Sequence, residues 1–430
     1  MGNTINIDKY VGIGFRGIIP SAIDPSAAAY FTATGITGAT QKTAIDNLVK
    51  GLKADGLWSK MKAVYPFVTD NRNLLGYTED FGNAYWGKNA GLTVTANTTT
   101  APNGTLTADT ISISGIDKAL YSPQVSTALG VVMKISFYIK ATSGQQGNTV
   151  YVRTPWSEVG QFITLTSEWI RHEINYTTNG ATYGVEWSNK NSATATSFYL
   201  WGAQLELGST ATTYQPIATT QQAFISSQFK YNLVNPVDSD AAFRLVFNGG
   251  WTHSSNGATP NGTNGYADTK LNDSILTPNS SHMSYYSRTN VLAGTYDIGA
   301  FNGTKGIWFG LRNQIVTGFF TGGIFQTGTS GEASVANSDS RGYYVGGKNG
   351  NTTVKFYKNG ANVVSIAKAD ATATNTSIYL ASLNQNGTPS FGFSTKQCAF
   401  STIGDGLLDA EAAALYSHVQ NFQLALNRAV

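Results

Sequence analysis

Hydrophobic and polar residues alternate along most of this chain, and an alternation with a period of two predicts β-strands. The clearest stretch runs from Val131 to Ile139, where every second residue is apolar. Lys358-Asn-Gly-Ala361 separates two further stretches and predicts a hairpin, because Asn-Gly favours tight turns between antiparallel strands. Comparable stretches occur at 150–153, 162–165, 169–176, 242–247, 282–287, 307–311, 343–346, 353–357, 363–366 and 377–383. Many short strands separated by Gly and Asn turns predict a mainly β protein built from β-sandwiches.

Two segments show the helical spacing of apolar residues instead. The first helix is predicted over 42–66, where Pro66 ends it. The second is predicted over 410–427, with Asp409 as its N-cap. The apolar stripe of this second helix consists of Leu415, Val419, Phe422 and Leu426. Such stripes usually face a core, so we expect two α-helices that flank the sandwiches.

The first 29 residues are short apolar pieces cut by Gly and Pro, which predicts an extended N-terminal arm over 1–29. Two interpretations of this arm remain open. It is either a flexible terminus or a docking segment that becomes ordered on a partner protein. The chain does not begin with a basic region followed by an apolar one, so no signal peptide is predicted. No run of about 20 apolar residues predicts a membrane span.

Composition narrows the class of protein. Charged residues make up only 12% of the 430 positions, and 28 Lys and Arg oppose 25 Asp and Glu for a net charge of +3. A nucleic-acid groove or a polybasic membrane patch is therefore not expected. The surface must consist largely of Thr, Ser, Asn and Gly, as in extracellular adhesins and virion fibres. The single cysteine, Cys398, excludes an intramolecular disulfide, and its apolar neighbours predict a buried, inert thiol.

The stretch from Phe198 to Pro216 is the most distinctive of the chain. Apolar residues occupy both parities as far as Leu207, which predicts a strand that is covered on both faces. Gly208 stops this strand, and Tyr214 lies in the segment that closes it. The segment therefore predicts the last strand of a sandwich and the turn that follows it.

From residue 201 to 216 the sequence WGAQLELGSTATTYQP resembles the closing strand of a carbohydrate-binding jelly roll that recurs in tailed-phage proteins. Five earlier motifs follow the order of that family, namely Asn73–Trp86, Ala101–Thr105, Thr107–Asp109, Ile135–Ala141 and Glu168–Trp169. The resemblance implies a two-sheet jelly roll over 72–223.

The C-terminal part carries a second resemblance. Val363–Ala367, Ile378–Ser382 and Phe400–Ile403 with the helix after them are similar to the end of a concanavalin A-like or laminin-G-like sandwich. Such a sandwich occurs in structural proteins of tailed phages, including crAss-like phages. In those chains a segment similar to Lys60–Val68 directly precedes one similar to Phe229–Pro236.

Here the jelly-roll block separates those two segments, which indicates an insertion. We expect 30–71 and 224–430 to form one discontinuous concanavalin A-like/laminin-G-like domain, with 72–223 inserted into it at a surface loop. The expected fold is mainly β: two β-sandwich (jelly-roll) domains, one inserted into the other, with two flanking α-helices and an extended N-terminal arm.

Candidate chemistry is sparse. No nucleophile elbow, zinc-protease, P-loop or dinucleotide motif is present. Glu168 and Glu173 flank one strand at opposite parities rather than as a facing pair, so we expect no enzyme. Glycosidase carboxylates pair in space, however, which leaves a polysaccharide-degrading function as an alternative. Asp238 and Asp240 place two carboxylates in one turn, which predicts either a structural calcium site or a turn that these side chains cap themselves.

Sugar binding requires flat aromatic faces beside groups that bind hydroxyls. Three tryptophans stand at positions that are structural in the resembled family, so we expect a core role for Trp86, Trp169 and Trp201. The candidate glycan-binding residues of the jelly roll are Trp156, Trp187, Tyr151 and Arg153. A loop of the second sandwich adds Trp251, His253 and Asn256. For both sets, ordinary packing of these side chains on their own sheet is the alternative.

These observations predict a phage virion structural protein: a fibre, decoration or receptor-binding subunit assembled in the host cytoplasm and exposed on the particle. Its jelly roll is expected to adhere to host or mucosal glycans without catalysis. The expected partners are those glycans and, through the N-terminal arm, other capsid or tail proteins, with neither nucleic acid nor membrane. By analogy with fibres, a homo-oligomer is expected, with a trimer favoured. The alternatives are a purely structural capsid or tail component and a polysaccharide-degrading tail protein.

Overall fold

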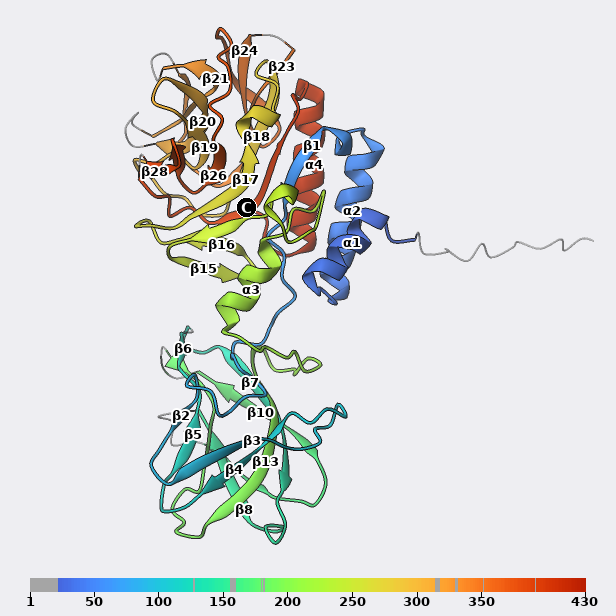
Figure 1. Cartoon of the computed structure of the whole chain (residues 1–430), viewed down its shortest axis with the longest axis vertical. Coiled ribbons are helices and arrows are strands. Elements are labelled where there is room, and N and C mark those ends of the chain that lie inside the picture. The colour runs from blue at the N-terminus through green and yellow to red at the C-terminus, as the bar shows by residue number, and fades with distance from the viewer. Residues whose placement is uncertain are drawn as a thin grey trace, which may run out of the picture.

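The computed structural model shows two bodies joined end to end (Figure 1). It describes residues 22–126, 128–154, 160–178, 180, 182–313, 318–328, 332–350, 352–390 and 392–430. Within these ranges, the strands of residues 87–207 pair only with one another. We call that body the jelly-roll domain and the other body the larger domain.

The jelly-roll domain consists of two five-stranded antiparallel sheets around one core. In spatial order, one sheet contains β10 (Ile170–Thr177), β7 (Val132–Ala141), β13 (Thr196–Leu207), β4 (Ala108–Ile113) and β3 (Leu92–Thr99). The other contains β2 (Gly87–Lys88), β5 (Ala119–Tyr121), β12 (Glu186–Ser188), β8 (Thr149–Arg153) and β9 (Gly160–Thr164). A separate short pair joins β6 (Val125–Ser126) to β11 (Thr182–Tyr183). The alternation in β7 is real, since Met133, Ile135 and Phe137 all enter the core.

Strand β13 is covered on both faces, as its apolar pattern predicts. Leu200 and Leu205 enter the core between the sheets. The opposite face is covered by the chain that returns after the strand. There the Trp201 indole N–H donates to Thr107 Oγ1 at 2.9 Å, and the Trp201 ring lies 4.6 Å from that of Tyr214. Trp86 and Trp201 are buried as expected, whereas Trp169 is half-buried beside Trp201.

The polar residues of the same motif fasten this return segment. Gln204 Oε1 accepts from the backbone N–H of Gln215 at 2.8 Å. The Glu206 carboxylate accepts from both the backbone N–H (3.0 Å) and the hydroxyl (2.6 Å) of Thr212. Gly202 adopts a left-handed φ of 68°, which favours glycine, at the bulge where the pairing with β7 shifts register. The motif therefore encodes a strand together with its own cover.

The larger domain is a second sandwich. One sheet contains β15 (Trp251–Ser254), β16 (Gly257–Pro260), β29 (Cys398–Gly404), β18 (Ser280–Ser287), β23 (Gly342–Asn349), β24 (Thr353–Lys358) and β25 (Ala361–Ala367), with β1 (Met61–Tyr65) beside β29. The other contains β14 (Val246–Asn248), β17 (Tyr266–Asn272), β26 (Ser377–Leu380), β19 (Ile298–Phe301), β20 (Lys305–Asn313), β21 (Phe319–Thr327) and β22 (Ala333–Ala336), with β27 (Leu383–Gln385) and β28 (Thr388–Ser390) alongside. The hairpin predicted at Lys358–Ala361 joins β24 to β25. A mainly β fold of sandwiches is thus confirmed.

Residues on either side of the jelly roll share one sheet. Strand β1 pairs antiparallel with β29, and Met61 lies opposite Gly404 while Tyr65 lies opposite Ser401. An inserted domain produces this arrangement, because the chain leaves the sheet after β1 and completes it only near the C-terminus. The boundaries of the insertion, 72 and 223, stay a prediction.

The part of the chain that the structure describes contains four α-helices rather than the expected two: α1 (Pro25–Thr34), α2 (Ala39–Ala54), α3 (Gln221–Phe229) and α4 (Asp409–Ala425). Short 3₁₀ turns add η1 (Trp58–Lys60), η2 (Asp240–Ala242) and η3 (Asp273–Ile275). Helices α1, α2 and α4 lie on one flank of the larger domain (Figure 1). They pack against ring residues of its sheet that include Tyr286, Tyr343 and Phe400. Asp409 is the first residue of α4, one position after the N-cap.

Two sequence-based boundaries are wrong. The helix expected over 42–66 ends at Ala54, because Gly56 adopts a left-handed φ of 71° and the chain then turns into β1. The extended arm expected over 1–29 is wrong at its end, where Asp24 caps α1 and Pro25 is its first residue. Residues 1–21 lie outside the described ranges, so a docking role for them stays a prediction.

Candidate functional site

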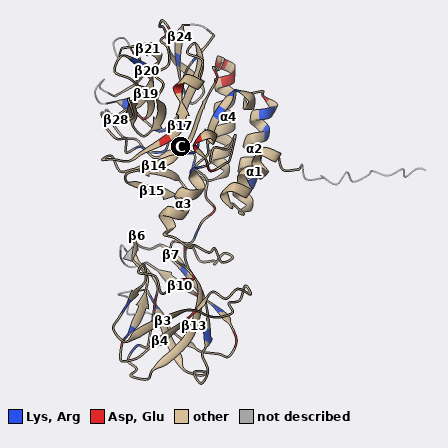
Figure 2. Cartoon of the chain, viewed as in Figure 1, with Lys and Arg blue, Asp and Glu red and all other residues tan. Residues whose placement is uncertain are grey.

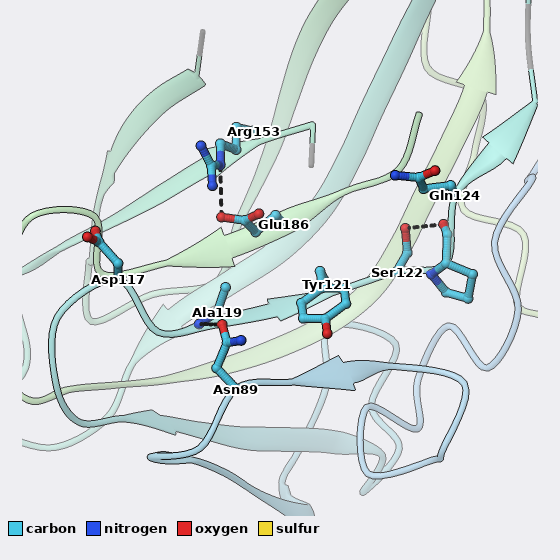
Figure 3. A pocket seen from close by; sticks show the side chains of 9 residues that line it. Asn89, Asp117, Ala119, Tyr121, Ser122, Gln124, Arg153 and Glu186 are labelled. Carbon is cyan, nitrogen blue, oxygen red and sulfur yellow. Dashed lines mark hydrogen bonds and ion pairs between the residues drawn. The ribbon is translucent and has the colours of Figure 1, made fainter. Parts of the chain in front are cut away.

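A groove of about 410 Å³ opens on the outer face of the second sheet of the jelly-roll domain (Figure 3). Strands β5, β12 and β8 lie side by side beneath it. Its lining consists of Asn89, Asp117, Ala119, Tyr121, Ser122, Pro123, Gln124, Arg153 and Glu186. Because these residues come from separate segments of the chain, only the folded sheet assembles them.

Strand alternation explains which side chains reach the groove. Trp187 of β12 points into the core with Leu120 and Val152 from the neighbouring strands, which it directly opposes. The adjacent residues must then point outward. Glu186 consequently stands between its two cross-strand partners, Tyr121 and Arg153.

Tyr121 supplies the aromatic face of the groove. Tyr121 is 37% exposed and, with Phe162, is one of two aromatic residues among the exposed large hydrophobic residues described in this domain. It lies opposite Gly87 of β2, and a side-chain carbon on Gly87 would collide with the tyrosine ring. The glycine thus allows the ring to lie against the sheet and leaves room above it, as a stacking surface requires.

An ion pair lies beside this ring. Arg153 Nε donates to Glu186 Oε1 at 2.9 Å, and the two side chains are only 25% and 9% exposed. At the rim, Asn89 Oδ1 accepts from the Ala119 N–H at 3.0 Å, which holds the amide at the groove edge. Asp117, also at the rim, completes a set of planar polar groups around one aromatic face.

A second hollow of about 260 Å³ adjoins the first. It shares the walls Asp117, Arg153 and Glu186 and is otherwise lined by Ser188, Lys190 and Asn191. Asp117 Oδ1 accepts from the Asn191 N–H at 2.7 Å, which ties the two loops at this end together.

The predicted jelly-roll residues meet different fates. Arg153 lines the groove, whereas Tyr151 is 5% exposed and packs with its ring 4.7 Å from that of Phe162. Trp187 is fully buried among aromatic rings, so the expected exposed platform at this position is wrong. The polar segment around Trp187 forms the short strand β12, and alternation turns the indole inward. Trp156 lies outside the described residues.

The predicted loop of the larger domain is mostly packed on its own hairpin. The Trp251 indole N–H donates to the Asn248 carbonyl at 3.0 Å, and its ring stacks on His253 at 6.2 Å. Burial of His253 lowers its pKa to about 4. Only Asn256, in the β15–β16 turn, is exposed. Trp251 and His253 therefore stabilise the sheet, and the expectation of a binding loop here is wrong for both residues.

The Asp238–Asp240 turn is held by cations of the protein itself. Arg244 donates to both carboxylates at 2.8 Å, and Lys230 also binds Asp238. The hydrogen bonds from Lys230 and Arg244 lower the pKa of Asp238. Because basic side chains neutralise the carboxylates, the geometry does not support the calcium prediction.

The described ranges of the chain lack two kinds of feature. They contain no cluster of three or more His, Cys, Asp or Glu side chains that could hold a metal ion. None of their helices is long and apolar enough to cross a membrane. Charged side chains are scattered over both domains (Figure 2).

Sequence reasoning missed Asn89, Asp117, Tyr121 and Glu186. The usable signal was parity: Glu186 and Ser188 flank Trp187, so an inward indole forces both neighbours outward. A three-residue strand is too short to show this pattern on its own.

No protein-family model and no curated protein matches this chain. Several solved structures resemble part of it. The CBM22-1 xylan-binding domain of Paenibacillus barcinonensis Xyn10C is 16% identical, covers 35% of this chain and 96% of its own, and has a TM-score of 0.22. A family 11 carbohydrate-binding module from Clostridium thermocellum is 18% identical over 32% of this chain and 94% of its own, with a TM-score of 0.21. The enzymatically active domain of bacteriophage CBA120 tailspike protein 4 is 14% identical over 33% of this chain and 22% of its own, with a TM-score of 0.24. At these TM-scores the likeness carries no information about the ligand of this chain.

Proposed function

We propose that the jelly-roll domain binds a glycan in the groove around Tyr121. The observation that carries this proposal is one exposed aromatic face beside the planar Arg153–Glu186 pair and the Asn89 amide. A sugar presents an apolar C–H face and a rim of hydroxyls. The ring can stack on the first, and the guanidinium, carboxylate and amide can bind the second.

The groove is better suited to binding than to catalysis. Its two carboxylates, Asp117 and Glu186, are both engaged: Glu186 by Arg153 and Asp117 by the Asn191 N–H. A glycosidase instead needs one carboxyl group that is protonated and a second that attacks or activates water.

At the level of the whole chain, the proposed protein is a phage virion subunit, either a fibre, a decoration or a receptor-binding protein. Support comes from the motif resemblances and from the neutral, hydroxyl-rich surface. Residues 1–29 would contribute to attachment on capsid or tail proteins, and a homotrimer would repeat the groove on the particle. Repetition matters because several weak glycan contacts on one particle combine into tight adhesion.

The test is binding of the purified full chain to host capsule extract and mucin. Tyr121→Ala is expected to weaken binding by roughly tenfold, equivalent to about 1.4 kcal/mol. Tyr199→Ala is the matched control, since Tyr199 is a half-buried tyrosine on the opposite sheet. Equal binding by both variants and the wild type would place the glycan elsewhere. Absence of binding to any bacterial or mucosal glycan would refute the function.

A purely structural role is the second candidate, because the end of the jelly-roll domain exposes apolar side chains. Leu129 and Leu207 are 69% and 57% exposed, and Val132, whose carbonyl accepts from the Gly208 N–H, is 37% exposed. Such groups suit a protein contact. A map of the native particle separates the two candidates: a groove open to solvent supports glycan binding, and one covered by a neighbouring subunit supports the structural role.

A further inference from the structure

The two hollows follow one another along strand β12. Tyr121 lies opposite Glu186, and Ala119 lies opposite Ser188. The two strands are antiparallel. Residues 122–124 therefore follow Tyr121 at one end of the paired stretch, and residues 188–191 continue from the opposite end. The first hollow is lined by the former segment and the second hollow by the latter, so Glu186 stands at their boundary.

The residues at this boundary can contact a ligand that lies across both hollows. Arg153 and Glu186 line both hollows and are bonded to each other at 2.9 Å. Strands β5 and β8 flank β12, and neighbouring strands are about 4.8 Å apart, so Tyr121 and Arg153 are separated by roughly 10 Å. A single sugar ring stacked on Tyr121 therefore covers only part of this lining, because the residues that line the second hollow alone, Ser188, Lys190 and Asn191, lie beyond Glu186 along the chain.

The charges of the described residues that line the two hollows balance. Asp117 and Glu186 carry negative charge, and Arg153 and Lys190 carry positive charge. The Lys190 ammonium lies 4.6 Å from the centre of the Tyr151 ring, and Glu186 is matched by Arg153. An acidic sugar would meet two carboxylates without a surplus of cations, and like charges in a partly buried site repel.

From these observations we infer that the groove takes an internal stretch of at least two sugar units from a neutral polysaccharide. One unit stacks on Tyr121, the next occupies the second hollow, and the hydroxyls beside their linkage bind the Arg153–Glu186 pair. This inference rests on the proposed glycan-binding function and specifies its substrate class.

The first test needs no variant. Titration calorimetry of the full chain compares glucose and galactose with ladders of neutral gluco- and galacto-oligosaccharides, and with alginate and polysialic acid as acidic polymers. Affinity is expected to rise at least tenfold from monosaccharide to oligosaccharide and to be insensitive to salt. The acidic polymers are expected to bind at least tenfold more weakly.

The second test changes the charge at the boundary. Glu186→Gln removes the negative charge that Arg153 Nε contacts, so binding of neutral oligosaccharides should fall roughly tenfold while salt-sensitive binding of alginate appears. Glu168→Gln, the same change at an exposed position, is the control and should alter neither. A monosaccharide that binds as well as its oligomers, or a wild-type preference for acidic polymers, overturns this inference while glycan binding stands. Failure of every sugar to bind overturns the proposed function itself.

Discussion

Trp187 and Tyr121 are aromatic residues on adjacent strands, but we expect their replacement to have opposite effects on stability and on glycan binding. Trp187 is fully buried, so Trp187→Ala should destabilise the jelly-roll domain without acting on the glycan directly. Tyr121 lines the groove, so Tyr121→Ala should weaken binding and leave stability nearly unchanged. The pair of variants therefore separates core from site.

The size of the Trp187 effect follows from its surroundings. Its ring lies 5.4 Å from Phe137, 5.9 Å from Trp86 and 6.1 Å from Phe81. Removing a buried tryptophan costs about 3–5 kcal/mol, and three lost aromatic contacts place this site near the upper end. For a domain of about 150 residues, a loss of 5 kcal/mol lowers the melting temperature by roughly 10–20 °C.

Trp187→Phe provides a finer comparison. The buried indole N–H of Trp187 has no hydrogen-bond partner among the described residues, so Trp187→Phe loses no described hydrogen bond and removes an unsatisfied donor. We expect this variant to lie within about 2 kcal/mol of the wild type. Urea denaturation followed by tryptophan fluorescence and calorimetry measures both variants. The reasoning is refuted if Trp187→Ala unfolds like the wild type and yet loses glycan binding at a temperature where it is folded.

Three further predictions concern the larger domain. Lys396 and Asp297 form an ion pair at 3.1 Å, and both side chains are fully buried. Lys396→Met should therefore lower the free energy of unfolding, measured by urea denaturation, by about 3–5 kcal/mol, and adding Asp297→Asn should recover part of that loss. Losses that simply add in the double variant would argue against a coupled pair. Burial lowers the pKa of His282 and of His253 to about 4, below the value of about 6.5 in the unfolded chain. The stability that each histidine contributes is therefore fully present above pH 6.5. As the pH falls from 6.5 to 4, each histidine should lower the free energy of unfolding by on the order of 3 kcal/mol. A urea midpoint that stays constant across this range would contradict the prediction. Cys398 is buried and its thiol pKa is raised by burial, so thiol reagents should label it only after urea unfolds the domain.

Sequence patterns succeeded where an element was long or its chemistry was local. Strand β13 was predictable because apolar residues fill both parities, and the hairpin at Lys358–Ala361 because Asn-Gly favours one turn geometry. Helix α4 was predictable from its stripe, and Leu415, Val419 and Phe422 are indeed buried.

The same patterns failed where a segment depends on a distant partner. Residues 61–65 continue an apparent helical spacing, but they form β1 because β29, more than 330 positions later in the chain, offers an unpaired edge. Trp187 lies in a polar segment that resembles a turn, yet pairing with β5 and β8 makes the segment a strand and turns the indole into the core. Hydrogen bonds to a remote strand are not written in local periodicity.

The sequence by itself determined the class of fold, the double cover of β13, and the neutral surface with a single inert cysteine. Each follows from residue type and near-neighbour spacing, since alternation, turn chemistry and composition act within a few residues. Only the tertiary structure decided the site. Tyr121, Glu186 and Arg153 are at least 32 positions apart from one another, and the strand order β5-β12-β8 brings them together. That order depends on which sheet edges and core faces fit together. As a result, the predicted Trp187 is buried, and the aromatic face of the candidate groove comes from Tyr121, which lies against Gly87.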